Sequence, residues 1–210
     1  MREKITSAGN QQATSIKFEG ASETIRQAPT CLVSMAYLQG ALHDGTFNKY
    51  NQRYRFSQKG ADWLNILKDT LLITGNNSWI YKEGSNRKVY VLETLAKFLD
   101  TQFNPLKLKT SEEKAAYLRG FFDADGGIPK DSKARFYIQL VQNDKNKLEK
   151  LKFLLDEIGI RTGIIHNPSF AKDPDYFRMF VLSDSREKFV RMIGTWHPRK
   201  LKILKRRMKI

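Results

Sequence analysis

Apolar residues recur along this chain with two different periods. The stretch TCLVSMAYLQGALHDGTF, residues 30–47, has the spacing of one helix face. QRYRFSQK then alternates charged and aromatic residues, which is typical of a strand with two unlike faces. GADWLNILKDTLLI is helical again, SWIYK and RKVYVL predict a hairpin around residues 83–86, and ETLAKFL predicts a short closing helix.

The same order of elements is predicted a second time after a break at Asn104-Pro105. A helix over about residues 111–123 leads to the strand RFYIQLVQ, the helix DKNKLEKLKFLLDEIGI, the strands RTGIIH and YFRMFVL, and the helix SREKFVRMI. Segments beginning at GTFN and GGIPK supply the first strand of each copy. The chain is therefore predicted to have four parts: a polar N-terminal extension at 1–30, a first repeat at 31–100, a linker at 101–111 and a second repeat at 112–210.

The spacing of matching residues supports a duplication. Gly40 in AYLQGALHDG and Gly120 in AYLRGFFDADG lie 80 residues apart. In both copies a strand ends in glutamine, Gln58 or Gln142, and a helix starts about two residues later. A long period that occurs only twice indicates duplicated halves and not a solenoid.

The charge of the chain points to a polyanionic partner. Among 210 residues, 37 are Lys or Arg and 22 are Asp or Glu, which gives a net charge of +15. Aromatic residues make up 11% of the chain, which favours folded structure over a disordered basic arm. On charge alone, a generic RNA-binding protein is an open alternative.

Several classes of protein are disfavoured. Cys31 is the only cysteine, so an intrachain disulfide or a thiolate metal cluster is impossible. No glycine-rich phosphate loop is present, and the three histidines lack zinc-ligand spacing, so no small-molecule cofactor is expected. No apolar run approaches about 18 residues, and the N-terminus shows no targeting signal. We expect a soluble intracellular protein without a membrane partner, cytoplasmic in a prokaryote and organelle-encoded otherwise.

The segment AYLRGFFDADGGI, residues 116–128, combines two acids with a helix end. Asp123 and Asp125 close an otherwise apolar helical run and precede two glycines. A carboxylate there faces the negative end of the helix dipole, so a nearby positive charge should offset the cost. A bound metal ion is the obvious candidate.

LRGFFDADG, residues 118–126, resembles the LAGLIDADG signature of homing endonucleases, and LQGALHDG is a shorter, weaker match. The resemblance implies an α+β fold of two pseudo-twofold-related αββαββα repeats, each with a curved antiparallel sheet that forms part of a DNA-binding saddle. The two motif helices would pack together at the centre, with Gly40 and Gly120 on the seam and Asp123 near the end of the partner helix.

The resemblance also implies the chemistry. Asp44 and Asp125 would bind Mg²⁺, or Mn²⁺ or Ca²⁺ in its place, and promote phosphodiester hydrolysis. The supporting catalytic residues by the same resemblance are Gln58, Gln142, Lys109 and Lys200. The expected protein is a monomeric, intron- or intein-associated endonuclease that makes a double-strand break with short 3′ overhangs at a target of about 20 bp. An RNA maturase or a non-catalytic DNA-binding regulator on the same fold is the alternative.

The first motif departs from the pattern. Gly40 precedes Asp44 by four residues, whereas Gly120 precedes Asp125 by five. One missing α-helical residue means about 100° of rotation and about 1.5 Å of rise. The first helix must therefore end differently, with a tightened last turn, for the acids to meet; otherwise Asp44-Gly45 is merely a polar turn. His43 also replaces the acid expected there.

Strand parity predicts which side chains face DNA. The outward side chains of QRYRFSQ and RFYIQLVQ are expected to read bases in double-stranded DNA: Arg53, Arg55, Arg135, Tyr137 and Gln139. The lysines expected to touch phosphates are Lys49, Lys82, Lys88, Lys130 and Lys133. For any single lysine in so basic a chain, simple surface solvation is the competing interpretation.

Overall fold

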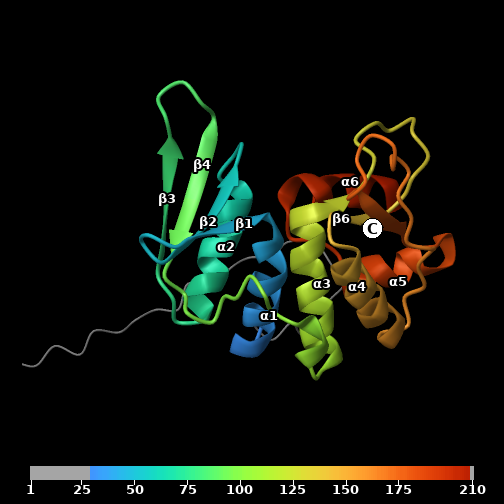
Figure 1. The fold of residues 1–210 in the computed structure, drawn as a ribbon, viewed down its shortest axis with the longest axis horizontal. Helices are drawn as coiled ribbons and strands as arrows, with labels where there is room; N and C mark the ends of the chain where they lie inside the picture. Colours follow the sequence, from blue (N-terminus) through green and yellow to red (C-terminus); the bar gives the residue numbers. More distant parts are fainter. Residues whose placement is uncertain (1–28, 209–210) are drawn as a thin grey trace, which may run out of the picture.

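The computed structural model describes residues 29–208, which form two helix-and-sheet units side by side (Figure 1). Residues 1–28 of the predicted extension lie outside the described residues. Within 29–208, no helix has the length and apolar character needed to cross a membrane.

The first unit contains two α-helices, one short 3₁₀ helix and one sheet. Its elements are α1 (Cys31–Ala41), the short 3₁₀ helix η1 (Leu42–Asp44), β1 (Gly45–Asn48), β2 (Arg53–Gln58), α2 (Asp62–Ile73), β3 (Ser78–Glu83) and β4 (Val89–Thr94). The strands pair antiparallel in the order β1-β2-β4-β3, and β3 and β4 form the predicted hairpin.

The second unit repeats this plan with a smaller sheet. Its elements are η2 (Pro105–Lys107), α3 (Ser111–Asp125), β5 (Gly126–Gly127), β6 (Gln139–Gln142), α4 (Lys145–Glu157), β7 (Phe177–Phe180), η3 (Ser183–Ser185), α5 (Arg186–Met192) and α6 (Pro198–Met208). The order β5-β6-β7 continues through isolated bridges from Thr162 to Val181 and from His166 to Arg178. The segment 161–166 therefore occupies the position of β3, and the two units share one topology.

Local sequence accounts for the main elements. In β2, Phe56 is fully buried and Tyr54 packs on the core, whereas Arg53 and Arg55 face outward, as the alternation predicts. Helix α3 starts with a capping box, because the Thr110 hydroxyl accepts from the Glu113 amide and the Glu113 carboxylate accepts from the Thr110 amide.

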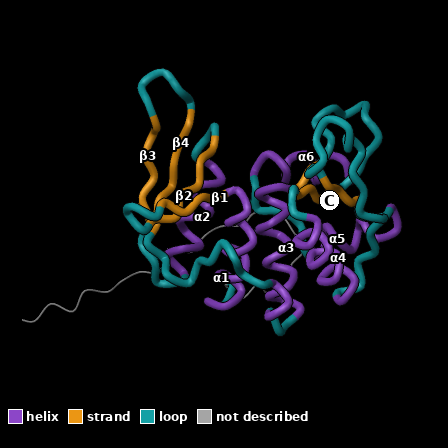
Figure 2. Tube along the Cα trace, viewed as in Figure 1, coloured by secondary structure: helices purple, strands orange, loops and turns teal. Residues whose placement is uncertain are grey.

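Helices α1 and α3 run side by side between the two units, with their C-terminal ends on the same side (Figures 1 and 2). A Cβ at Gly40 would lie 2.0 Å from the Tyr117 carbonyl oxygen, and one at Gly120 would lie 2.0 Å from the Tyr37 carbonyl oxygen. Each tyrosine stands three residues before the glycine of its own helix, so the contact is reciprocal. This contact between α1 and α3, called the seam below, has pseudo-twofold symmetry. At Gly40 and Gly120 the two backbones lie too close for any side chain larger than hydrogen.

The predicted closing helix at residues 93–99 is wrong. Strand β4 continues through Thr94, which lies opposite both Tyr54 of β2 and Ser78 of β3. The Thr94 hydroxyl also donates to the Asn77 carbonyl at 2.8 Å. Pairing on both sides holds Thr94 in the sheet, and the described residues 95–100 form no helix.

The predicted strand at residues 135–142 is too long, because only Gln139–Gln142 form β6. Arg207 of α6 binds the loop that precedes this segment. Its guanidinium donates to the carbonyl oxygens of Asp131 at 3.3 Å and Ala134 at 2.7 Å, and also to that of Ser132. These carbonyls all precede residue 135, and the Ile138 carbonyl still accepts from the Val181 amide at 2.9 Å, so one hydrogen bond extends the β6–β7 ladder past Gln139.

Replacing Gly120 with alanine should destabilise the fold by at least about 3 kcal/mol, since the added methyl meets backbone that cannot rotate away. Chemical denaturation monitored by circular dichroism measures the change. Gly60→Ala is the matched control, because no atom lies within 4 Å of a Cβ there. Equal stability of the two variants would contradict a close seam.

Candidate active site

The two motif helices end differently, and the difference compensates for the missing residue. Between Gly40 and Asp44 the last three residues, Leu42–Asp44, form a 3₁₀ turn, whereas α3 stays α-helical from Gly120 to Asp125. A 3₁₀ residue rises about 2.0 Å and an α residue about 1.5 Å, so both acids stand about 7.5 Å beyond their glycines. The difference in rotation falls from about 100° to about 40°. The expected tightened last turn is confirmed.

The structure brings Asp44 and Asp125 together. Partial burial, followed by repulsion from Asp44, raises the pKa of Asp125 to about 6, and Lys200 opposes this rise. Asp44 is exposed at the surface, but the protein around it still desolvates its carboxylate and raises its pKa to about 6, against the hydrogen bond from Gln58 and the charge of Lys200. Two neighbouring carboxylates with raised pKa values form a site that favours a cation.

The donor set fits a hard divalent cation. Both acids offer oxygen ligands, as Mg²⁺ prefers. Within residues 29–208, no group of three or more His, Cys, Asp or Glu side chains could hold a metal ion. A cation held by Asp44 and Asp125 would therefore complete its shell with water and with phosphate oxygens of a substrate, which is the usual coordination of Mg²⁺.

Lys200 reaches the site from α6. Its side chain is 3% exposed, and its ammonium donates to the Asp123 carbonyl at 2.9 Å and also to that of Phe122. Burial lowers the pKa of Lys200 to about 8, although Asp123, Asp125 and Asp44 raise it. The ammonium therefore caps the last turn of α3 and lies within electrostatic reach of both metal-binding candidates.

Lys109 does not reach the site, contrary to the expectation from the sequence. It is exposed and precedes the N-terminus of α3, a 15-residue helix that ends at Asp125. A helix of that length separates its two ends by about 22 Å. Lys109 is therefore excluded from the catalytic group.

Two equivalent hydrogen bonds cross the seam. Tyr37 donates to Asp123 at 2.8 Å, and Tyr117 lies 2.9 Å from Nε2 of His43. His43 and Asp123 each stand three residues after the glycine of their helix, so the histidine occupies the position of the acid. Burial raises the pKa of Asp123, which also accepts from the Thr195 hydroxyl and, at 3.0 Å, from the Trp196 amide. Asp123 thus fixes the segment that leads into α6.

The two glutamines are placed unequally. Gln58 donates to Asp44, whereas the amide nitrogen of Gln142 lies 3.3 Å from Nδ1 of His43. The Gln142 oxygen accepts from the Asn143 amide at 2.8 Å. Burial, aided by Lys147, lowers the pKa of His43 to about 4, so its ring is neutral at pH 7 and Nδ1 can accept from Gln142. Gln58 therefore contacts an acid, and Gln142 contacts the histidine of the other unit.

Arg53 and Arg55 face outward but already have acidic partners. Arg53 forms an ion pair with Glu93 at 3.1 Å and lies over the Trp79 ring at 4.8 Å. Arg55 forms an ion pair with Glu83. To read a base, either arginine must first exchange its carboxylate partner.

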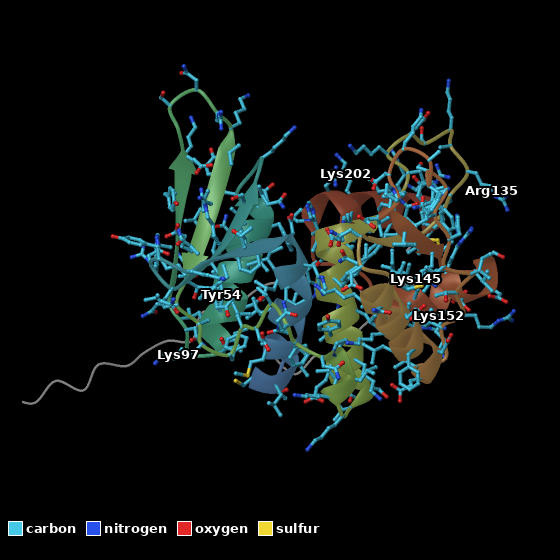
Figure 3. All side chains as sticks on the ribbon, viewed as in Figure 1. Tyr54, Lys97, Arg135, Lys145, Lys152 and Lys202 are labelled. Atoms are coloured by element: carbon cyan, nitrogen blue, oxygen red, sulfur yellow. The ribbon has the colours of Figure 1, made fainter. Side chains whose placement is uncertain are left out.

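The other predicted DNA contacts fall into two groups. The side chains that are exposed are Lys49, Lys82, Lys88, Lys130, Lys133 and Arg135. Figure 3 shows Arg135 on the outer rim of the second unit. Tyr137 is half-buried against Phe180, and the half-buried Gln139 lies over Gly127, where a Cβ would come 2.5 Å from its amide nitrogen.

This arrangement of two sheet-bearing units, joined by glycine-lined helices that each end in an acid, is that of the LAGLIDADG fold. Residues 112–194 match the LAGLIDADG-like domain family, which confirms the resemblance predicted from the sequence.

Homing endonuclease I-ApeI of Aeropyrum pernix is 29% identical over 201 residues, covering 81% of this chain and 85% of that protein. The structure of I-DmoI in complex with DNA and Mn matches with a TM-score of 0.59 at 20% identity, over 79% of this chain and 98% of that chain. Full-length DUF199/WhiA from Thermatoga maritima matches with a TM-score of 0.63 at 15% identity, over 88% of this chain and 62% of that chain. The structural matches establish the fold.

Asp125→Asn should stabilise the metal-free protein at pH 7 by about 1 kcal/mol, because it removes a half-buried charge beside Asp44. The pKa of Asp125 is about 6 in the folded state against an ordinary 3.8, so the folded protein binds more protons between these values. Its stability therefore falls as pH rises through this window, and the advantage of the variant should shrink toward pH 4.

Denaturation in a chelating buffer at several pH values measures this effect. Asp69→Asn, at an exposed position of α2, is the control; it keeps Asp125 and should retain the parental dependence of stability on pH. A variant that is less stable than the parent at pH 7 would contradict repulsion between the two acids.

Proposed function

We propose that this chain is a site-specific DNA endonuclease that hydrolyses one phosphodiester in each strand. The observation that carries the proposal is the meeting of Asp44 and Asp125, one from each pseudo-twofold unit, at the ends of the seam helices. Two acids related by that symmetry suit a substrate with two antiparallel strands. The related I-ApeI is named a homing endonuclease, and I-DmoI has been solved with DNA and Mn, Mg or Ca.

Asp44 and Asp125 would hold the divalent cation, which when bound polarises the phosphate and favours hydroxide over water as the nucleophile. Gln58 touches Asp44, so it can orient the attacking water through its amide. Lys200 holds the end of α3 in place through the Phe122 and Asp123 carbonyls, and its positive charge favours a phosphate nearby.

The finer features of the reaction follow from the family. We propose a double-strand break with short 3′ overhangs at a target of about 20 bp, made by a monomer, since one chain carries both acids. The outward strand faces would read bases, and the exposed lysines would contact phosphates. An intron- or intein-associated homing role follows from the same resemblance.

An RNA maturase or a non-catalytic DNA-binding regulator could use the same fold. The acid pair favours cleavage over both, because its mutual repulsion serves no purpose in a protein that only binds. Binding without cleavage, or a preference for folded RNA over duplex DNA, would favour these alternatives.

Asp44→Asn and Asp125→Asn should each retain duplex binding and lose at least about a thousandfold in cleavage rate, since removing a metal ligand removes several kcal/mol of transition-state stabilisation. The assay incubates purified protein and Mg²⁺ with a duplex library of randomised inserts and sequences the cut ends. Chelation of Mg²⁺ should abolish cutting by the parent. Parental protein that binds all duplexes equally and never cuts with Mg²⁺ would refute the enzyme assignment.

The unequal glutamines predict unequal strand cleavage. Gln58→Ala should slow cutting of one strand about tenfold or more and allow nicked duplex to accumulate, because Gln58 contacts Asp44. Gln142→Ala should change either rate by less than about threefold, because the Gln142 side chain makes its hydrogen bonds with His43 and with the Asn143 amide. End-labelling each strand of a selected target separates the two rates. Equal losses in both variants would show that the glutamines act alike.

A further inference from the structure

Helix α6 (Pro198–Met208) has two unlike faces and was not predicted from the sequence. Lys200 and Leu204 are buried against the second unit, at 3% and 1% exposed. Arg199, Lys202 and Arg206 are exposed. Their spacing of three and four residues places them on one stripe of the helix, away from the buried face.

The stripe formed by Arg199, Lys202 and Arg206 is positively charged, and no acidic residue on α6 neutralises it. The sequence of α6, PRKLKILKRRM, contains no acid. Among the described residues, none of Arg199, Lys202 and Arg206 forms an ion pair with a carboxylate. Three aligned cations of this kind repel one another, so an anionic partner would stabilise them.

The stripe begins beside the candidate active site. Arg199 precedes Lys200, whose ammonium caps α3 and lies within electrostatic reach of Asp44 and Asp125. Figure 1 shows α6 between the β3–β4 hairpin and the loops of the second unit, on the side where α1 and α3 end. Figure 3 shows Lys202 on this side of the molecule.

The helix is held in position before any ligand binds. Asp123 fixes the preceding segment through Thr195 and Trp196, and Arg207 binds backbone carbonyls of the loop at residues 131–134. A pre-positioned helix loses little conformational entropy on binding.

We propose that this stripe binds the phosphodiester backbone of a DNA duplex next to the cleaved phosphates, a contact that rests on the proposed function. From Arg199 to Arg206 the helix rises about 10.5 Å, and one DNA strand carries a phosphate about every 3.4 Å along its axis. The stripe therefore spans about three phosphate intervals, so its three cations can contact phosphates within a run of about four along one strand. Contacts of this kind add affinity and position the duplex without reading sequence.

The test compares two triple variants with the same change in charge. The stripe variant carries Arg199→Gln, Lys202→Gln and Arg206→Gln. The control carries Lys68→Gln, Lys97→Gln and Lys107→Gln, three exposed residues on α2, after β4 and in η2. Circular dichroism and thermal denaturation check that both variants fold. A third variant, Arg199→Lys with Arg206→Lys, keeps the stripe charge.

Binding is measured by fluorescence anisotropy over a range of salt concentrations with a random-sequence duplex of about 30 bp. The stripe variant should lose between about two and three units from the slope of log affinity against log salt, and bind at least about tenfold more weakly at 0.1 M salt. The control and the lysine variant should keep the parental slope.

If the stripe variant and the control lose affinity equally while the parent still binds and cuts duplex, the α6 contact is overturned and the endonuclease function stands. If the parent binds a single-stranded RNA of the same length more tightly than the duplex, and the stripe variant loses that binding, the partner is RNA and the proposed contact is overturned. A parent that binds no duplex overturns both proposals.

Discussion

The close approach of α1 and α3 is the constraint on which the rest of the structure depends. Glycine at positions 40 and 120 lets each backbone meet a tyrosine carbonyl of the other helix, where even a methyl group would clash. That contact sets the pseudo-twofold axis, brings two units of equivalent topology together and directs both helix C-termini to one side. The acids meet because the seam leaves their helices no freedom to diverge.

The pseudo-twofold symmetry holds for the positions of the two acids along their helices, but the side chains around the acids differ between the two units. The 3₁₀ turn lengthens the rise of the shorter first motif, so Asp44 lies about as far beyond Gly40 as Asp125 lies beyond Gly120. His43 takes the position of Asp123 and keeps the hydrogen bond to a tyrosine across the seam. Its ring also binds Gln142, a contact that the first unit does not repeat for Gln58. Two halves with one backbone plan thereby acquire unequal surroundings for their acids.

The charged residues fall into two groups: some form hydrogen bonds within the protein, and others are available to bind a cation or a polyanion. Asp123 and Lys200 are buried and form hydrogen bonds with other groups of the protein, which join the end of α3 to α6. Asp44 and Asp125 repel each other in the metal-free protein, which costs stability and favours a cation. Arg53 and Arg55 are paired with glutamates on the sheet surface, whereas Arg199, Lys202 and Arg206 form no ion pair with a carboxylate among the described residues. These three cations are therefore better placed to meet a polyanion.

The sequence by itself determined the duplication, the alternation of β2, the seam glycines and the acid-bearing helix ends, because each is a short-range pattern with a fixed period. It also required a tightened end for the first helix, since residue counts convert directly into rise and rotation. Tertiary structure alone decided the rest. Sheet pairing kept residues 93–94 in a strand, and the pairing with β7 limited β6 to Gln139–Gln142. Such outcomes depend on which distant groups compete for a hydrogen bond, and no local period encodes that competition.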